Sequence, residues 1–152
     1  MPKAPPATSR YWAVHRQMAR LNKVVFRKTR GRLGGTFLGS PVLLLDHVGR
    51  KSGEARTSPL IYLDNDPDLV IVASKGGTDT NPAWFHNLMA MTSTEVELPG
   101  GARRVVRPRV AKGAERAALW LRLVSLYKPY AAYASYTQRE IPVVVLEPVQ
   151  ES

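Results

Sequence analysis

One stretch of the sequence, residues 42–63, constrains the fold more than any other part of the chain. Two runs rich in Val, Leu, Ile and Tyr flank a polar segment, Gly49–Glu54. Residues of this kind favour β-strands, and the glycines Gly49 and Gly53 permit the positive φ angles of a tight turn. The stretch therefore predicts a β-hairpin with a polar tip.

The predicted tip concentrates positive charge. It carries Arg50 and Lys51, the hydroxyl of Ser52 and, at its base, Arg56. Cations held on a rigid turn form a site for a polyanion such as a phosphate or a carboxylate-rich tail. A solvated basic turn is the alternative, because most short runs of charge are simply exposed to water.

Composition narrows the class of protein. The chain has 152 residues, of which 44% are hydrophobic and 22% are charged, as is typical of soluble globular proteins. It contains no cysteine, which excludes disulfides, zinc–thiolate sites and thiol nucleophiles. No run approaches the roughly 18 apolar residues of a membrane span, and the N-terminus has no apolar signal segment. We therefore expect a cytoplasmic protein.

The net charge of +10 is concentrated near the N-terminus, where residues 1–45 contain nine Lys or Arg and no acid. Residues 10–30 predict a helix with apolar positions on one side and basic positions on the other. This helix would pack on the core or lie on an anionic membrane surface, at the inner face of the cell membrane, and both interpretations stay open. No nucleic-acid-binding motif accompanies it, so no nucleic-acid partner is expected. We expect residues 1–33 to form a disordered start followed by this helix, and residues 34–152 to form the main domain.

The rest of the chain predicts further strands and helices. Residues 69–74, 95–98, 102–110 and 141–146 carry β-forming residues bounded by turn signals. Residues 83–91 and 114–127 carry helical patterns, and Pro129 interrupts the second of them. The mixture predicts an α+β fold.

Side chains for direct hydrolytic chemistry are missing from the sequence patterns. The three histidines lie on separate predicted elements, without the spacing of metal ligands, and no G-x-S-x-G motif is present. Cationic loops, small residues at a strand end and clustered aromatics instead suit a large, flat, anionic cofactor. Four tyrosines recur every three residues: Tyr127, Tyr130, Tyr133 and Tyr136. They would form either a packing edge or an aromatic pocket for a substrate.

Three motifs, in order, make the chain similar to a known family. They are Gly49-Arg50-Lys51-Ser52-Gly53 with Arg56, Ser74-Lys75-Gly76-Gly77, and Asn81-Pro82-Ala83-Trp84-Phe85-His86-Asn87-Leu88. Together with the tyrosine-bearing segment, they resemble the deazaflavin-dependent nitroreductase family over about residues 34–148. Two places depart from the family pattern: Met91-Thr92-Ser93 replaces a common Asn-Pro turn, and Tyr136 stands where a tryptophan can occur.

The resemblance implies a split β-barrel of the flavin-reductase type, mostly antiparallel, over residues 34–152. It also implies binding of 8-hydroxy-5-deazaflavin (coenzyme F-420), with Arg50, Lys51, Ser52 and Arg56 holding its phosphate and oligoglutamate tail. The residues expected to line its ring and ribityl chain are Ser58, Pro59, Leu60, Ile61, Val72, Ala73, Ser74, Lys75, Ala83, Trp84, Phe85, His86 and Asn87. The tyrosines Tyr127, Tyr130, Tyr133 and Tyr136 are expected to bind the substrate.

The activity that the resemblance implies is hydride transfer from the reduced coenzyme to a quinone, an activated alkene or a nitroaromatic acceptor. Tyr130 is the first candidate for the group that supplies a proton or stabilises developing negative charge, and Ser74 is the second. Two alternatives remain: a non-catalytic deazaflavin-binding or membrane-attached module, and a flavin mononucleotide enzyme of the same fold.

Overall fold

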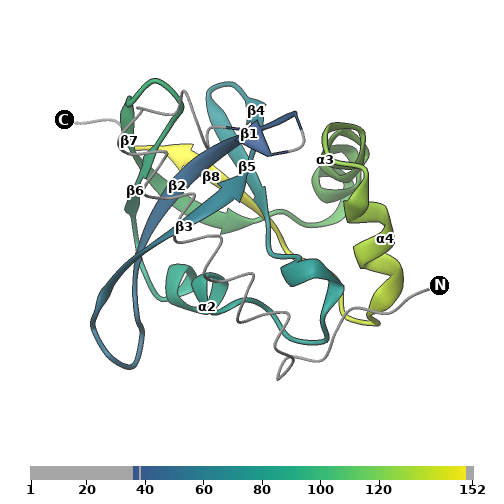
Figure 1. Ribbon diagram of the computed structural model, residues 1–152, viewed down its shortest axis with the longest axis horizontal. Coiled ribbons are helices and arrows are strands. Elements are labelled where there is room, and N and C mark those ends of the chain that lie inside the picture. The colour runs from purple at the N-terminus through teal and green to yellow at the C-terminus, as the bar shows by residue number, and fades with distance from the viewer. Residues whose placement is uncertain (1–35, 38, 150–152) are drawn as a thin grey trace.

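The computed structural model describes residues 36–37 and 39–149, as one antiparallel sheet with helices packed on it (Figure 1). The strands are β1 (Thr36–Phe37), β2 (Ser40–Val48), β3 (Ala55–Ile61), β4 (Leu63–Asn65), β5 (Asp68–Val72), β6 (Thr94–Glu97), β7 (Arg103–Val110) and β8 (Val143–Pro148). The helices are the 3-10 turn η1 (Lys75–Gly77), α2 (Ala83–Met89), α3 (Gly113–Leu126) and α4 (Pro129–Tyr136). The helix predicted over residues 10–30 lies outside the described residues.

Strand β2 organises the sheet. The strand order is β1-β2-β6-β7-β8-β5-β4, and β3 also pairs with β2. The β2–β3 register runs from Val42 opposite Ile61 to Val48 opposite Ala55, so the hairpin predicted over residues 42–63 is confirmed. Two backbone hydrogen bonds close its loop: the Gly49 amide donates to the Glu54 carbonyl at 2.9 Å, and the Gly53 amide donates to the Gly49 carbonyl at 2.8 Å. This loop projects from the sheet at the lower left of Figure 1.

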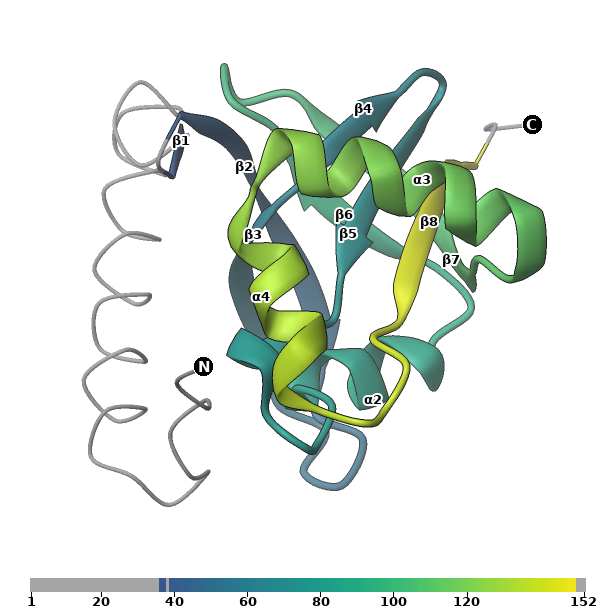
Figure 2. The same ribbon diagram turned by 90° about the vertical axis from the view of Figure 1, so that its right-hand side faces the viewer.

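Alternating side chains give the sheet two hydrophobic cores. Ile71 of β5 and Val144 of β8 are register partners and face one core, which α2 covers with Trp84 and Leu88. The next residues along these strands face the second core, which α3 and α4 cover (Figure 2). Each fully buried Val, Leu or Ile side chain stabilises the fold by about 1.5–3 kcal/mol relative to an exposed one. Both faces of the central strands are therefore fixed by packing, which holds the strand ends in place.

Most predicted elements are confirmed with shifted ends. Helix α2 ends at Met89 rather than residue 91, α3 spans Gly113–Leu126, and the break at Pro129 starts α4. Strand β8 begins at Val143 rather than at the predicted residue Ile141, although Ile141 is buried. Pro142 has no backbone N–H to donate to the sheet, and its carbonyl accepts a hydrogen bond from the Ala73 amide at 3.0 Å. Within the described residues, no helix combines the length and apolarity needed to cross a bilayer.

Candidate functional site

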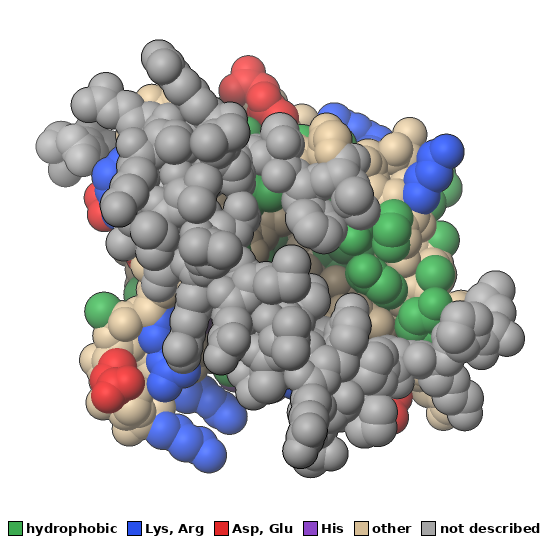
Figure 3. Space-filling view, viewed as in Figure 1, with side chains coloured by type: hydrophobic (Ala, Val, Ile, Leu, Met, Phe, Trp, Pro, Cys, Tyr) green, Lys and Arg blue, Asp and Glu red, His purple; other side chains and the backbone are tan. Residues whose placement is uncertain are grey.

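The tip of the β2–β3 hairpin forms a small cradle above Gly49. A Cβ atom added to Gly49 would overlap the Ser52 hydroxyl oxygen and would lie 3.3 Å from Arg56 Nε. The hydroxyl and the guanidinium thus converge on a space that only glycine leaves open. Lys and Arg side chains gather over this hairpin tip at the lower left of Figure 3. The cradle therefore has the donors and the charge that bind an anion.

The cations at the tip are largely free to bind a ligand. Arg50, Lys51 and Ser52 are exposed, and the Arg56 side chain is 49% exposed. Arg56 pairs with the exposed carboxylate of Glu54 at 3.9 Å, a separation at which a surface ion pair contributes little. A bound anion would replace this weak pair at small cost.

A chain of hydrogen bonds connects the tip to helix α2 and strand β3. The Arg50 amide donates to Asn87 Oδ1 at 3.0 Å, and Asn87 Nδ2 lies 3.0 Å from His47 Nδ1. On the other side of the ring, His47 Nε2 lies 2.9 Å from Ser58 Oγ. His47 and Asn87 are buried, at 4% and 5% exposure. Three separate segments of the predicted coenzyme site are thus joined through one imidazole.

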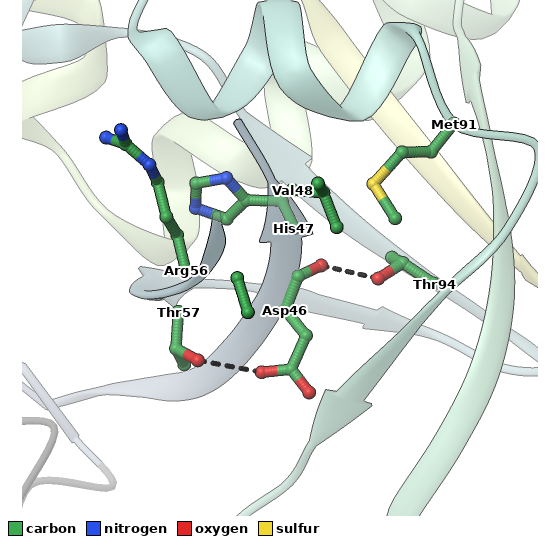
Figure 4. Close-up of a pocket in the computed structure, with 8 residues that line it drawn as sticks. Asp46, His47, Val48, Arg56, Thr57, Met91 and Thr94 are labelled. Atoms are coloured by element: carbon green, nitrogen blue, oxygen red, sulfur yellow. Dashed lines mark hydrogen bonds between the residues drawn. The ribbon is translucent and has the colours of Figure 1, made fainter. Parts of the chain in front are cut away.

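The electrostatics around His47 keep its ring neutral. Burial lowers the pKa of His47 below 6.5, the neighbouring Arg56 lowers it further, and Asp46 acts in the opposite direction. These residues line a cavity of about 330 Å³ together with Met91 and Thr94. Figure 4 shows the His47 ring pointing from β2 toward α2, with Arg56 on the neighbouring strand. Asp46 accepts a hydrogen bond from the Thr57 hydroxyl at 2.9 Å.

The segment after β5 forms the second part of the site. Lys75 has φ +45°, and Gly76 and Gly77 follow with φ +63° and +81°, so the chain turns sharply beyond Ser74. The Arg139 guanidinium clamps this turn, because it donates to the Ser74 carbonyl at 2.7 Å and the Thr78 carbonyl at 2.8 Å. It also donates to the Asn81 side chain at 2.7 Å, just before α2. The turn is therefore held in one conformation.

Helix α4 packs directly on this turn. A Cβ on Gly77 would lie 2.6 Å from the Tyr133 carbonyl oxygen and 2.9 Å from Tyr136 Cδ2. The four tyrosine rings form a chain of contacts, from Tyr127–Tyr130 at 4.9 Å between centroids to Tyr133–Tyr136 at 6.4 Å. Close contact at Gly77 thus brings the Ser74–Gly77 turn beside the tyrosine segment.

The tyrosines differ in exposure. Tyr130 is only 4% exposed and lies in the second core against Trp120 and Tyr127. Burial, with Tyr127 and Tyr133 nearby, raises its pKa, so the phenol keeps its proton at neutral pH. Tyr133 and Tyr136 are half-buried. This placement favours packing for Tyr130 and leaves Tyr133 and Tyr136 more accessible to a substrate.

The remaining predicted residues lie along β3, at the end of β5 and on α2. Ser58–Ile61 are half-buried, as are Ser74 and Lys75, whereas the side chains of Val72 and Ala73 are buried in the two cores. On α2, Ala83 is exposed, Trp84 is core, and Phe85 and His86 are half-buried, with ring centroids 5.7 Å apart. The buried members would therefore meet a ligand through their backbone only.

Two residues of the site were missed by the sequence analysis. His47 follows Leu43 and Leu45 at alternate positions of β2, so its side chain faces the core that these leucines fill. A histidine at a core-facing position of a strand predicts a buried side chain that has a hydrogen-bond partner. Arg139 had no such signal, because its partners are mostly backbone carbonyls of a distant turn.

Comparisons with known proteins agree with this geometry. The sequence profile of the F₄₂₀H₂-dependent quinone reductases, named for the reduced form of coenzyme F-420, matches residues 17–148. A Mycobacterium tuberculosis protein described as an F₄₂₀H₂-dependent quinone reductase is 38% identical over 136 residues, which cover 86% of this chain and 89% of the relative. Another protein of that organism, described as a candidate for the same activity, is 42% identical over 118 residues, covering 77% of this chain and 98% of the relative.

A solved structure of an F₄₂₀H₂-dependent reductase superposes with a TM-score of 0.62 at 34% identity, covering 70% of this chain and 94% of that chain. The fold is thus the split β-barrel that the resemblance implied. The chain belongs to the F₄₂₀H₂-dependent quinone reductase family.

Proposed function

We propose that this protein is a reductase that transfers a hydride from reduced coenzyme F-420 to a quinone. The observation that carries the proposal is the cradle above Gly49, where a hydroxyl and a guanidinium converge beside two exposed cations. A phosphate-bearing coenzyme with a carboxylate-rich tail has the charge that this cradle suits. The family relationship supports the coenzyme and the acceptor class.

The side chains at the hairpin tip fit the anionic part of the coenzyme. Arg50, Lys51 and Arg56 would neutralise its phosphate and tail carboxylates, and Ser52 would donate one hydrogen bond. Ser58 on β3 and the turn at Ser74 and Lys75 would border the ring. When bound, the reduced deazaflavin supplies a hydride and no single electrons.

The protein's own contribution to the reaction is binding, orientation and one proton. Ser74 is half-buried at the clamped turn and carries a hydroxyl next to the cationic Lys75, so it is an accessible donor to an acceptor oxygen. Tyr130 is the second candidate: its phenol carries a proton at neutral pH, but its raised pKa makes it a weaker acid and its burial restricts contact. The half-buried Tyr133 and Tyr136 would orient a planar acceptor.

An anaerobic turnover assay tests the proposal. Reduced coenzyme F-420 is mixed with the protein and menadione, and the absorbance change of the coenzyme is followed. Turnover that saturates with both substrates is expected. Coenzyme binding without turnover by any quinone would make the protein a binding module, and a preference for flavin mononucleotide would assign it to the flavin enzymes of the same fold.

Nitro compounds and activated alkenes are proposed as further acceptors, because a hydride donor held in an open site reduces electron-poor acceptors of several kinds. We also propose that the basic N-terminal segment attaches the protein to anionic membranes, where lipid-soluble quinones are available. Nine basic residues and no acid within residues 1–45 support this attachment. Sedimentation with anionic vesicles, compared between the full chain and a full chain with Arg16, Arg20 and Arg27 changed to Gln, tests it.

A further inference from the structure

His47 is a buried titratable group that the reaction itself does not use. It lies on β2, one residue before the end of the strand, and is 4% exposed. Both of its ring nitrogens have polar partners, Asn87 from α2 and Ser58 from β3. A buried histidine with two partners from two different elements is positioned to hold those elements in register.

The hydrogen bonds fix which nitrogen carries the proton. The Arg50 backbone amide can only donate, so the atom of Asn87 that faces it, 3.0 Å away, is the oxygen. The Asn87 nitrogen therefore faces His47 Nδ1, and an amide nitrogen is only a donor. Nδ1 must then be the acceptor, and the neutral ring carries its proton on Nε2. From there it donates to Ser58 Oγ, 2.9 Å away.

This arrangement has a consequence for Ser58. Because its oxygen accepts from His47, the hydroxyl proton is directed elsewhere, and no acceptor for it lies among the residues that the structure describes. Ser58 is half-buried on β3, next to the cationic tip. Its hydroxyl is thus prepared to donate to an oxygen of a ligand bound there.

We propose that neutral His47 is a positioning residue for coenzyme binding, which anchors the cationic tip to α2 and orients the Ser58 hydroxyl toward the coenzyme, so that protonation of His47 weakens binding. This inference rests on the proposed function. Protonated Nδ1 would face the Asn87 amide nitrogen, which is also a donor. If Asn87 rotates to relieve this conflict, its oxygen leaves the Arg50 amide. In either case one of the hydrogen bonds that connect Arg50, Asn87 and His47 is lost.

The charges around the ring support a neutral resting state. Arg56 lies directly opposite on β3, and Asp46 precedes His47 on β2, with its carboxylate engaged by the Arg103 guanidinium at 2.7 Å. Helix α2 presents the uncharged Asn87 to the ring, with His86 as the adjacent residue. The segment that leads into β6 lines the cavity with the uncharged Met91 and Thr94. Loss of the neutral form therefore requires acid below pH 6.5.

The first experiment needs no coenzyme. Long-range ¹H–¹⁵N correlation spectra of the full chain identify the protonated ring nitrogen of each histidine, and the His47 signals are assigned by their loss in His47→Gln. The expected result is a proton on Nε2 at neutral pH and a titration midpoint of the His47 ring below pH 6.5. A proton on Nδ1 at neutral pH would overturn the inference, whatever the fate of the proposed function.

The second experiment measures the dissociation constant of coenzyme F-420 from pH 5 to 8. Gln has an oxygen for Asn87 and an N–H for Ser58 and does not titrate, so His47→Gln should bind with a flatter pH profile than the wild type. The wild type should lose about three- to tenfold in affinity relative to this variant at the acid end, as expected for one hydrogen bond. Comparing the two profiles removes the contribution of the coenzyme's own acidic groups.

Two further variants separate positioning from folding. Thr57→Val removes the neighbouring hydroxyl of β3, which bonds Asp46 rather than His47, and should keep the wild-type pH profile. Ser58→Ala should weaken binding at every pH but keep the acid loss of the wild type, because protonation of His47 acts on Asn87 and the Arg50 amide rather than on Ser58. Identical pH profiles in wild type and His47→Gln would refute the inference. If the wild type does not bind the coenzyme at any pH, the proposed function fails, while the spectra still decide the protonation state.

Discussion

Gly49→Ala is the sharpest test of the anion cradle, because the added methyl group fills the cradle without removing any donor. Gly49 has no positive φ, so its backbone accepts alanine without strain. The new Cβ overlaps the Ser52 hydroxyl and presses on Arg56 Nε at 3.3 Å. Both groups must move away from the point where they converge.

The two effects of this change differ in size. Displaced Ser52 stops accepting from the Glu54 amide, a 3.2 Å bond in an exposed loop, which costs about 0.5–1 kcal/mol of unfolding free energy. Binding loses one charge-assisted hydrogen bond to the anion, about 1.5–3 kcal/mol. The dissociation constant of coenzyme F-420 should therefore rise about 10- to 150-fold, while the protein stays folded.

The assay is a fluorescence or calorimetric titration with coenzyme F-420, beside a urea unfolding curve for each variant. Gly100→Ala is the matched control, since Gly100 lies in the turn between β6 and β7 with φ +97° and open space around its Cβ. That change strains the backbone but should leave the dissociation constant unaltered. An unchanged dissociation constant in folded Gly49→Ala would refute the cradle.

Three further predictions follow from the second core, the clamped turn and His47. Gly77→Ala should lower the unfolding free energy by about 2–5 kcal/mol in urea titrations, because φ at Gly77 is +81° and the new Cβ would lie 2.6 Å from the Tyr133 backbone. A variant as stable as the wild type would show that α4 does not pack tightly on the turn. Ser74→Ala should lower the rate of hydride transfer about 10²-fold in stopped-flow measurements. Tyr130→Phe should lower it less, because Tyr130 is 4% exposed and has little access to the substrate. A larger loss in Tyr130→Phe than in Ser74→Ala would make Tyr130 the proton donor. The pKa of His47 is lower in the folded state than in the unfolded state, so the unfolded state takes up a proton first as the pH falls. The unfolding free energy of the wild type should therefore fall relative to that of His47→Gln below pH 6.5. Parallel plots of unfolding free energy against pH for the two proteins would contradict this.

The part of the site that the sequence predicts is the part built by neighbouring residues. The hairpin tip is continuous in the chain, so strand propensity and two glycines predicted its shape, which the strand register confirms. Its three cations predicted an anion site at the tip, which stays a prediction. Tyr133 and Tyr136 were likewise placed on one segment, because Pro129 restarts the helix just before them.

The part that the sequence did not predict depends on contacts between distant segments. The bond from Arg139 to the Ser74 carbonyl spans 65 residues, and that from Asn87 to His47 spans 40. Neither partner changes the local pattern enough to identify the other. The burial of Tyr130 has the same origin, since spacing places the ring on the segment, whereas packing against α3 decides its exposure.

This division has a functional consequence. The anion cradle depends on a local turn, whereas the proposed acceptor side depends on α4 held against the Ser74–Gly77 turn by Gly77 and on the Arg139 clamp. Substitutions at Tyr133 or Tyr136 on α4 leave the hairpin tip and its charges intact. Binding of the anionic part of the coenzyme and acceptor preference should therefore vary independently in this fold, because no hydrogen bond within the described residues joins the hairpin tip to α4 directly.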